Sequence, residues 1–274
     1  MSLTRFIAMP DVKERFVADF PLPSAALFGP MVAQPVTKNY ALIGTAFDYL
    51  MRFYLERLNP GCITQPWVAE HSVDLTAPEP KLHKSLNSLL KFAKKSHAAY
   101  LKTGRLEDDI LTSAIFLAQL DIIYRVGKLD PDTGKADPGD LEDLKNLVGA
   151  IKPDLFKSKS VCMLNPTFGE GSMLVGGADA DIVIDNVLVD IKTSKYLEFT
   201  REQFNQIVGY YILNRYSGRV GGVEELKLSK LGIYYSRYSI LHLLPIEVIE
   251  SNPKLNSFIE WFVERAKEVY KPEA

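Results

Sequence analysis

The sequence contains little cysteine and little histidine. Its 274 residues include two cysteines, Cys62 and Cys162, and four histidines. Two cysteines cannot build the disulfide framework of a small secreted domain, and no Cys/His spacing matches a zinc site. We therefore expect neither kind of scaffold, and we expect a reducing, cytoplasmic setting.

The sequence also lacks a long apolar run and a strong charge of one sign. No stretch reaches the roughly 20 apolar residues that cross a bilayer, and the N-terminus shows no signal-peptide pattern. Lysine and arginine number 32 against 34 aspartate and glutamate, which gives a net charge of −2. We expect no membrane partner. The overall charge argues neither for nor against nucleic acid, so the local charge pattern has to decide.

The composition is that of a chain with a sizeable core. Hydrophobic residues make up 47% and charged residues 24%, as in ordinary globular proteins. The length suits one domain, residues 1–274, with an insertion. Helical and strand patterns follow one another, which predicts an α/β fold with a central mixed β-sheet flanked by helices. The proline-rich residues 1–38 are expected to form an N-terminal arm, and residues 81–150 a helical insertion or lid.

The most informative stretch lies between residues 176 and 195. Two apolar runs, 182–184 and 187–191, are separated by the turn-forming pair Asp185-Asn186. Such a pair between apolar runs predicts a β-hairpin. If these two residues form the loop, Asp181 stands directly opposite Asp190.

The alternation of side chains along a strand sorts this hairpin into two faces. One face carries four charged residues, Asp179, Asp181, Asp190 and Lys192, with Asp179 opposite Lys192. The other is expected to enter the core and carries Ile182, Ile184, Val187, Val189 and Ile191. Carboxylates that face each other across a sheet repel, so the arrangement favours a cation between them.

Mg²⁺ or Mn²⁺ suits such a pair, because these ions bind one or two carboxylates and retain several waters. Lys192 beside the ion would supply a compact positive charge for an anionic transition state or an attacking water. The alternative is an ordinary hairpin whose acidic face is solvated.

An acid on one strand followed by Asp-x-Lys on the next resembles the PD-(D/E)XK nuclease superfamily, which has the restriction-endonuclease-like fold. Asp181 matches the first acid, Asp190 the second acid and Lys192 the lysine. Ala180 replaces the proline that often precedes the first acid. Asp179 competes for that role, but Asp181 directly precedes the apolar run and faces Asp190. The resemblance implies a restriction-endonuclease-like core and phosphodiester hydrolysis.

The segment after the hairpin strengthens the resemblance. Residues 200–203, Thr-Arg-Glu-Gln, have the form of a capping box and predict the start of a helix. Gln206 and Tyr210 are four residues apart and share one face of that helix. A Gln-x-x-x-Tyr pair after Asp-x-Lys resembles the RecB-like branch of the superfamily. In that branch the pair helps to hold the active site and the nucleic-acid strand.

A further helix is expected from Tyr40 to Leu58. Its Gly44 to Asp48 segment resembles the Gly-x-x-x-His opening of RecB-like nucleases, with Asp48 in the place of the histidine that contributes a metal ligand there. Asp48 equally suits an ion pair with Arg52 at the next turn. Glu56 on the same helix and Glu170 in the loop before the hairpin are alternative ligands.

The resemblance thus implies a magnesium or manganese site with a defined set of ligands. These are Asp181, Asp190, the main-chain carbonyl of Ile191 and Asp48. Lys192 would position or help to deprotonate the attacking water, while Gln206 and Tyr210 would orient the site or the strand.

Residues 81–105 contain lysines and an arginine but no aspartate or glutamate. An apolar stripe predicts that they form a helix with one buried side. Basic charge of one sign in a near-neutral protein favours a phosphate-facing surface over a merely solvated one. Candidate nucleic-acid contacts are Lys91, Lys94 and Lys95 on this helix and Thr193, Ser194 and Lys195 after the hairpin.

Two other segments carry expectations of their own. Residues 72–75 suit a short strand. Arg237 lies at a bend within a later strand pattern, and a charge at the edge of the sheet is favoured there over a phosphate ligand.

These observations favour a metal-dependent nuclease that hydrolyses phosphodiester bonds of DNA in preference to RNA. One alternative is a catalytically inactive, nuclease-like protein that binds nucleic acid, and another is a non-enzymatic scaffold. The sequence leaves open whether ends or internal bonds are cut. A homodimer is one expected arrangement, because relatives with one active site per chain pair to cut a duplex.

Overall fold

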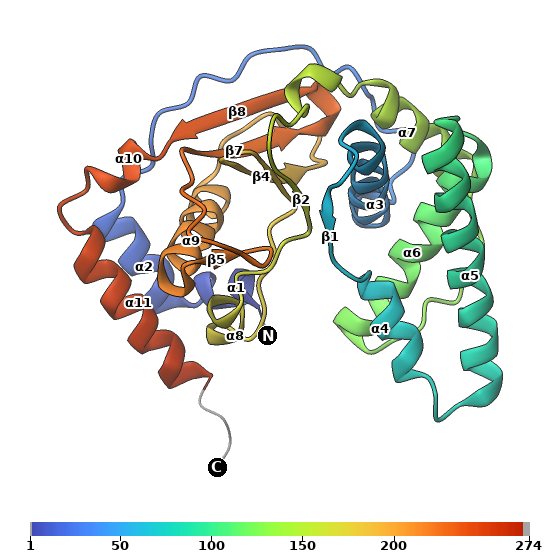
Figure 1. The fold of residues 1–274 in the computed structure, drawn as a ribbon, viewed down its shortest axis with the longest axis horizontal. Helices are drawn as coiled ribbons and strands as arrows, with labels where there is room; N and C mark the ends of the chain where they lie inside the picture. Colours follow the sequence, from blue (N-terminus) through green and yellow to red (C-terminus); the bar gives the residue numbers. More distant parts are fainter. Residues whose placement is uncertain (1, 271–274) are drawn as a thin grey trace.

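A six-stranded mixed sheet stands at the centre of the computed structural model, which describes residues 2–270 (Figure 1). The strand order is β1-β2-β3-β4-β7-β8. The pairs β1–β2 and β4–β7 are parallel, and the other neighbours are antiparallel. The strands are β1 (Ile63–Thr64), β2 (Cys162–Leu164), β3 (Ile182–Ile184), β4 (Val187–Lys192), β7 (Lys230–Tyr235) and β8 (Ile240–Pro245); β5 (Arg219–Val220) and β6 (Val223–Glu224) form a separate small hairpin.

The predicted hairpin is present, with the predicted register. Strands β3 and β4 pair Ile182 with Val189 and Ile184 with Val187. Asp185 in the turn has a φ of 54°, a left-handed conformation that aspartate tolerates because its side chain bonds locally. That carboxylate accepts hydrogen bonds from the backbone N–H of Ser160, at 2.8 Å, and that of Val161, at 3.1 Å.

Both faces of this hairpin are buried, whereas the sequence pattern predicted only one apolar face. Ile182, Ile184 and Val189 belong to the core on one side of the sheet. Val183 and Leu188 belong to the core on the other side, which is the side of the acids. The acidic face is therefore apolar along most of its length and becomes charged only at the end of β4.

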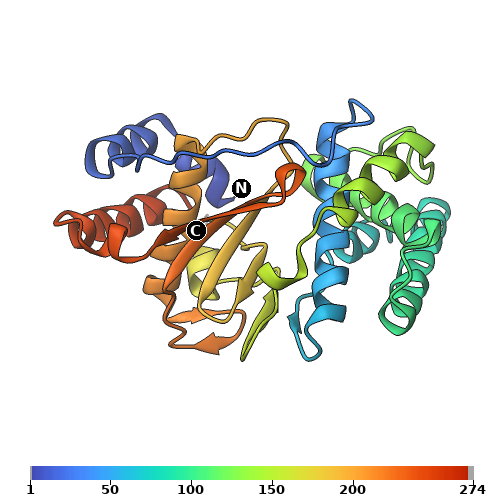
Figure 2. The same cartoon turned by 90° about the horizontal axis from the view of Figure 1, so that it is seen from above.

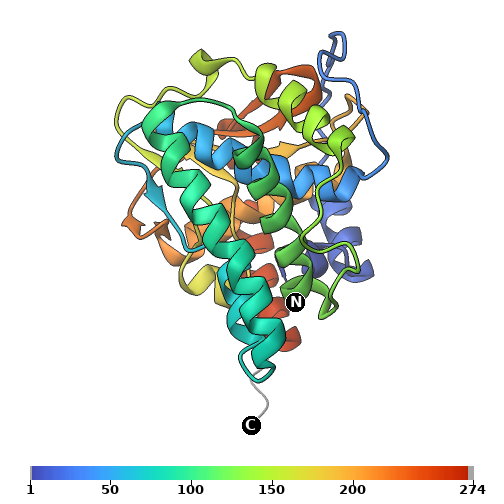
Figure 3. The ribbon, with the colours of Figure 1, turned by 90° about the vertical axis from the view of Figure 1, so that its right-hand side faces the viewer.

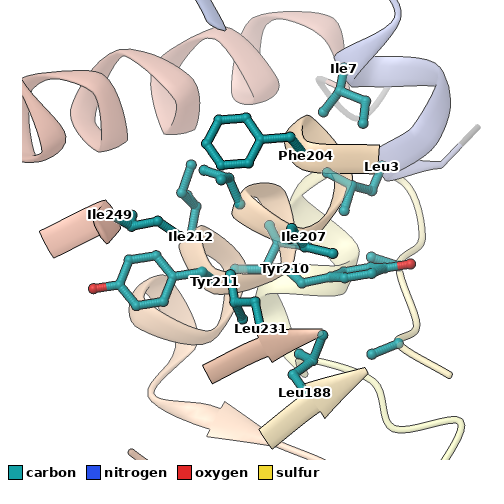
Figure 4. Packing of buried hydrophobic residues seen from close by; sticks show 14 of the residues in the cluster. Leu3, Ile7, Leu188, Phe204, Ile207, Tyr210, Tyr211, Ile212, Leu231 and Ile249 are labelled. Carbon is teal, nitrogen blue, oxygen red and sulfur yellow. The ribbon is translucent and has the colours of Figure 1, made fainter. Parts of the chain in front are cut away.

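Helix α9 (Arg201–Ser217) covers the acidic side of the sheet and connects the parallel strands β4 and β7, which need such a crossover. It begins at the predicted capping box, where the backbone N–H of Gln203 donates to Oγ1 of Thr200 at 3.3 Å. Its buried face lies over Leu188 and Leu231 of those strands (Figure 4). The same side carries α1 (Leu3–Ile7), α2 (Pro10–Asp19), α8 (Glu170–Leu174), α10 (Glu247–Glu250) and α11 (Leu255–Val269).

Helix α3 (Tyr40–Leu58), with the predicted bounds, lies against the other face of the sheet. Residues 81–150 contain three helices that pack outside it, as Figures 1 and 2 show. The helices on this side are α4 (Val68–Leu75), α5 (Pro80–Thr103), α6 (Asp108–Val126) and α7 (Pro138–Gly149). The chain is thus an α/β protein whose sheet is flanked by helices on both faces.

Two expectations for local structure are wrong. Residues 72–75 belong to helix α4 and form no strand, because Ala69, Ser72 and Val73 are buried at helical spacing. Arg237 is not at the sheet edge; it is 0% exposed and lies 2.7 Å from Oδ1 of Asp143. This buried ion pair excludes contact between Arg237 and a phosphate in this conformation.

The two cysteines are bonded to each other. The disulfide Cys62–Cys162 joins the start of the β1 region to β2, with Cα atoms 4.7 Å apart and a sequence separation of 100. It ties the segment after helix α3 to β2, the strand next to the edge strand β1, a link that the cysteine count did not indicate. Within residues 2–270, no helix combines the length and apolar character needed to cross a bilayer.

Candidate active site

Asp181 and Asp190 come together because the start of β3 lies beside the end of β4. The paired residues of the two strands end at Ile182 and Val189, and the next residues are the two acids. Oδ2 of Asp181 accepts a hydrogen bond of 2.5 Å from the backbone N–H of Ile191. Asp179 forms an antiparallel bridge with Thr167, and the pairing of β3 with β4 ends before it, at Ile182 and Val189.

Lys192 forms an ion pair with Asp190 on the same face of β4. Nζ of Lys192 lies 2.6 Å from Oδ2 of Asp190, and the Asp190 side chain is only 2% exposed. The Lys192 side chain is 28% exposed, so part of it borders solvent. Oδ2 of Asp190 is buried and accepts no well-directed hydrogen bond from any residue of the described range. Its only close charged partner in that range is thus the ammonium group of Lys192, and this contact is an ion pair without hydrogen-bond alignment.

Gln206 and Tyr210 extend this contact onto helix α9. Nζ of Lys192 donates to Oε1 of Gln206 at 2.9 Å, and Nε2 of Gln206 donates to the hydroxyl of Tyr210 at 2.8 Å. The Tyr210 ring stacks on Phe168, with the ring centroids 5.5 Å apart. In Figure 4 the Tyr210 hydroxyl points away from the labelled core side chains. The sequence pair thus holds the lysine in place from a rigid helix.

Asp48 approaches the same cluster from α3, but it also has a partner on its own helix. Its Oδ2 lies 2.6 Å from Nη2 of Arg52, so the ion pair offered as an alternative role is confirmed. Its Oδ1 is buried and has no hydrogen-bond partner within residues 2–270. The guanidinium of Arg52 lies over the ring of Tyr49, 4.2 Å from its centroid. Arg52 therefore holds Asp48 while leaving one of its oxygens free.

The site concentrates negative charge in a buried place. Burial raises the pKa of Asp181 well above its usual value, and the carboxylates of Asp190 and Asp48 raise it further. Burial also raises the pKa of Asp190, which the ammonium of Lys192 partly offsets. For Lys192, burial lowers the pKa, but Asp190 and Asp181 outweigh it and the net pKa is raised. Lys192 is therefore a cation at neutral pH, and an added cation would stabilise the ionised acids.

The other candidate ligands lie elsewhere. Oε2 of Glu56 is 3.0 Å from Nε2 of His97 on α5, so this carboxylate already has a partner there. Glu170 is exposed at the start of α8. Among the three acids weighed to complete a metal site, Asp48 is the one whose charge acts on both Asp181 and Asp190.

The candidate nucleic-acid contacts fall into two separate groups. Lys91, Lys94 and Lys95 are exposed on α5, the helix that lies in front in Figure 3. In Figure 1, α3 and α6 lie between α5 and the sheet. Nζ of Lys94 lies 2.7 Å from Oε2 of Glu70, a surface pair on the neighbouring helix. The structure does not bring these lysines to the acids.

Thr193, Ser194 and Lys195, by contrast, continue directly from β4. Oγ of Ser236 donates to Oγ1 of Thr193 at 3.0 Å, and the hydroxyl of Tyr238 donates to the carbonyl of Lys195 at 2.6 Å. These bonds hold the segment next to the end of the β7–β8 pair. It begins at the residue after Lys192 and therefore borders the site.

The donor set suits a hard divalent cation that keeps most of its water. Within residues 2–270, no group of three or more His, Cys, Asp and Glu side chains has the arrangement of a metal cluster. Mg²⁺ needs only one or two carboxylates, with carbonyl oxygens and water as the other ligands. Oδ1 of Asp48 is buried without a hydrogen-bond partner in the described residues, Oδ2 of Asp190 has only its ion-pair contact with Lys192, and Asp181 and the carbonyl of Ile191 stand beside Asp190. These residues fit the ion that the sequence resemblance implies.

Two contributors escaped the sequence analysis. Phe168, whose ring supports Tyr210, lies in a loop before the hairpin, where no periodic pattern indicates a partner. Asp121 is 1% exposed and accepts a 2.6 Å hydrogen bond from the hydroxyl of Tyr49, next to Arg52. No spacing in the sequence indicates its contact with Tyr49, from which it is separated by 72 residues.

Comparison of the chain with protein-family models, with curated proteins and with solved structures gives no match.

Proposed function

We propose that this chain is a metal-dependent nuclease of the PD-(D/E)XK type that hydrolyses phosphodiester bonds of DNA. The observation that carries the proposal is the Asp190–Lys192 ion pair beside Asp181 at the open end of a buried hairpin. Burying two acids next to a lysine lowers the stability of the fold, because removing charges from water is costly. A group of buried charges that lowers stability is typical of a functional site. The element order around it, a helix, β2, the β3–β4 hairpin, α9 and β7, also agrees with a restriction-endonuclease-like core.

The proposed reaction is attack of water on phosphorus with cleavage of the opposite P–O bond. The leaving oxygen takes up a proton from solvent, and the attacking water releases one proton to solvent. Lys192 is suited to orient that water or a non-bridging phosphate oxygen, because its ammonium group has N–H bonds beyond those used by Asp190 and Gln206. Gln206 fixes the direction of the ammonium group, and Tyr210 fixes Gln206.

Mg²⁺ or Mn²⁺ would be held by Asp190, Asp181, the carbonyl of Ile191 and Oδ1 of Asp48. When bound, such an ion lowers the pKa of a coordinated water and offsets charge on the scissile phosphate. Without it, the acids at this site would repel a phosphate, which gives the proposal a strict metal requirement.

The test is a cleavage assay on linear single-stranded DNA, linear duplex DNA, closed circular DNA and RNA, with Mg²⁺, Mn²⁺ or EDTA. The expected result is cleavage of DNA that needs the metal and is lost in Asp190→Asn. The matched control is Asp154→Asn, which changes an exposed acid paired with Lys157. Closed circular DNA separates internal cleavage from digestion at ends.

Two outcomes favour the alternatives. Tight binding of DNA by the wild type, without cleavage under any metal, would favour a catalytically inactive nucleic-acid-binding protein. Neither binding nor cleavage would favour a scaffold whose acids are structural. If the protein cuts both strands of a duplex, we expect it to be a homodimer. Size-exclusion chromatography with light scattering measures its oligomeric state.

A further inference from the structure

Two exposed tyrosines meet at one lysine beside the proposed active site. Tyr40, the first residue of α3, is 43% exposed, and Tyr196, in the loop after β4, is 63% exposed. Nζ of Lys195 lies 5.7 Å from the ring centroid of Tyr40 and 5.1 Å from that of Tyr196. Single exposed aromatic side chains are ordinary, but two rings from distant parts of the chain around one ammonium group form a composite surface.

The loop that carries Lys195 and Tyr196 is held in place. The hydroxyl of Tyr238 donates to the carbonyl of Lys195 at 2.6 Å, and the backbone N–H of Tyr196 donates to Oγ of Ser194 at 3.0 Å. Tyr40 is fixed by the helix that it starts. In Figure 2 this loop and the start of α3 lie at the same end of the molecule. The rings are therefore exposed and yet attached to an ordered backbone.

The distance of this surface from the acids is limited by the chain itself. Lys195 follows Lys192 by three residues, which span at most about 11 Å when fully extended. Tyr40 precedes Asp48 by eight residues of helix, which is about 12 Å along the axis. A strand with one phosphate at the acids therefore has neighbouring nucleotides within reach of the two tyrosines.

The chemistry of the surface selects unpaired bases. Exposed aromatic rings stack on base faces without regard to sequence, and a lysine between them attracts the phosphate backbone. The bases of an intact duplex have their faces covered by their neighbours and are not free to stack on protein rings.

We propose that Tyr40, Lys195 and Tyr196 form a stacking platform for single-stranded nucleic acid, so that the substrate of the proposed nuclease is a single strand or a frayed end. That the bound strand is a substrate rests on the proposed nuclease function. Binding itself is measured without any cleavage.

The experiment is fluorescence anisotropy with a labelled oligothymidine and with a labelled hairpin duplex, both in EDTA. The variants are Tyr40→Ala, Tyr196→Ala and Lys195→Gln, and Tyr124→Ala is the control, since Tyr124 is 57% exposed on α6. We expect each of the two ring deletions to weaken single-strand binding about 5- to 100-fold, which is the range for loss of one stacked base. Tyr40→Phe and Tyr196→Phe, which keep the rings, should bind as the wild type does.

Lys195→Gln should flatten the dependence of single-strand affinity on salt concentration, because one phosphate contact is lost. Unchanged single-strand affinity in both ring deletions would overturn the platform, as would wild-type preference for the hairpin duplex. The two proposals fail separately. Single-strand binding that depends on the two rings, without any cleavage, would support the stacking platform and overturn the proposed nuclease function. Metal-dependent cleavage, with a single-strand affinity that neither ring deletion changes, would support the nuclease function and overturn the platform.

Discussion

Oδ2 of Asp190 lies 2.6 Å from Nζ of Lys192, two residues further along the same strand. The pair stands where β4 leaves the apolar part of the sheet, with Asp181 across the hairpin and Gln206 above on α9. Lys192 supplies one positive charge to a place where the carboxylate of Asp48 raises the pKa of both Asp181 and Asp190. We therefore expect a metal cation to bind beside Lys192.

Binding of Mn²⁺ should stabilise the folded protein. A ligand at 100 times its Kd adds about 2.7 kcal/mol to the free energy of unfolding, which corresponds to several degrees in Tm for a chain of this size. We expect millimolar Mn²⁺ to raise the Tm of the wild type and of Asp154→Asn by this amount. Asp190→Asn should show little or no shift in the same thermal scan. Equal shifts in all three proteins would place the ion elsewhere.

The acids should lower the stability of the metal-free protein at neutral pH. Burial, with Asp190 and Asp48 beside it, raises the pKa of Asp181 in the folded state, so the folded protein holds this proton more tightly than the unfolded chain does. The free energy of unfolding then falls as pH rises from the unfolded value, near 4, through the folded pKa.

Replacement of Asp181 by asparagine removes that cost. We expect Asp181→Asn to increase the free energy of unfolding by about 0.5–2 kcal/mol at pH 7.5 in EDTA, the usual gain from relaxing a functional site. The gain should shrink as pH falls through the unfolded value to about 3, where most of the aspartate is protonated in both states. Urea denaturation at the two pH values measures it. A variant less stable than the wild type at pH 7.5 would contradict this account of the site.

The buried pair Arg237–Asp143 should be important for stability. Both side chains are 0% exposed, and Asp143 also accepts a 3.1 Å hydrogen bond from the backbone N–H of Val36. Arg237→Met leaves a buried carboxylate without its cation, and we expect it to lose about 3–5 kcal/mol. Asp11→Ala, which breaks an exposed pair with Arg265, should lose under about 1 kcal/mol. Similar losses in both variants, measured by urea denaturation, would argue against the buried pair.

The disulfide should stabilise the fold as well. Cys62 and Cys162 are separated by 100 residues, and loss of a bridge that closes a long loop typically costs about 2–5 kcal/mol. Dithiothreitol should lower the Tm of the wild type. It should leave the Tm of the double variant Cys62→Ser/Cys162→Ser unchanged. A thiol titration of the unfolded, unreduced protein that finds two free thiols would contradict the bond.

Local patterns predicted the parts of the fold that local interactions determine. The Asp185-Asn186 turn fixed the register of β3 and β4, and the capping box marked the start of α9. The contact of Asp48 with Arg52, one helical turn away, was also a local prediction. Each of these depends on residues within a few positions of one another in the chain.

The parts that the sequence did not predict depend on distant segments. Arg237 contacts Asp143, and Cys62 is bonded to Cys162, across segments far apart in the chain, and no spacing in the sequence indicates either contact. Residues 72–75 resemble a strand by composition, yet α4 packs on α6 and is helical. The helices on both sides of the sheet likewise bury Val183 and Leu188 on the acidic face of the hairpin, for which the alternating pattern predicted only charged residues.

The most direct test of the central claim is the rate of DNA cleavage in Mn²⁺ by Lys192→Ala, compared with Lys227→Ala, which changes an exposed lysine outside the site. Circular dichroism of both variants establishes that they are folded. We predict that Lys192→Ala loses at least about 100-fold of the wild-type rate, the usual effect of removing one donor positioned for developing negative charge, and that Lys227→Ala cleaves as the wild type does. Cleavage by folded Lys192→Ala at the wild-type rate would contradict the assignment of this hairpin as a nuclease site.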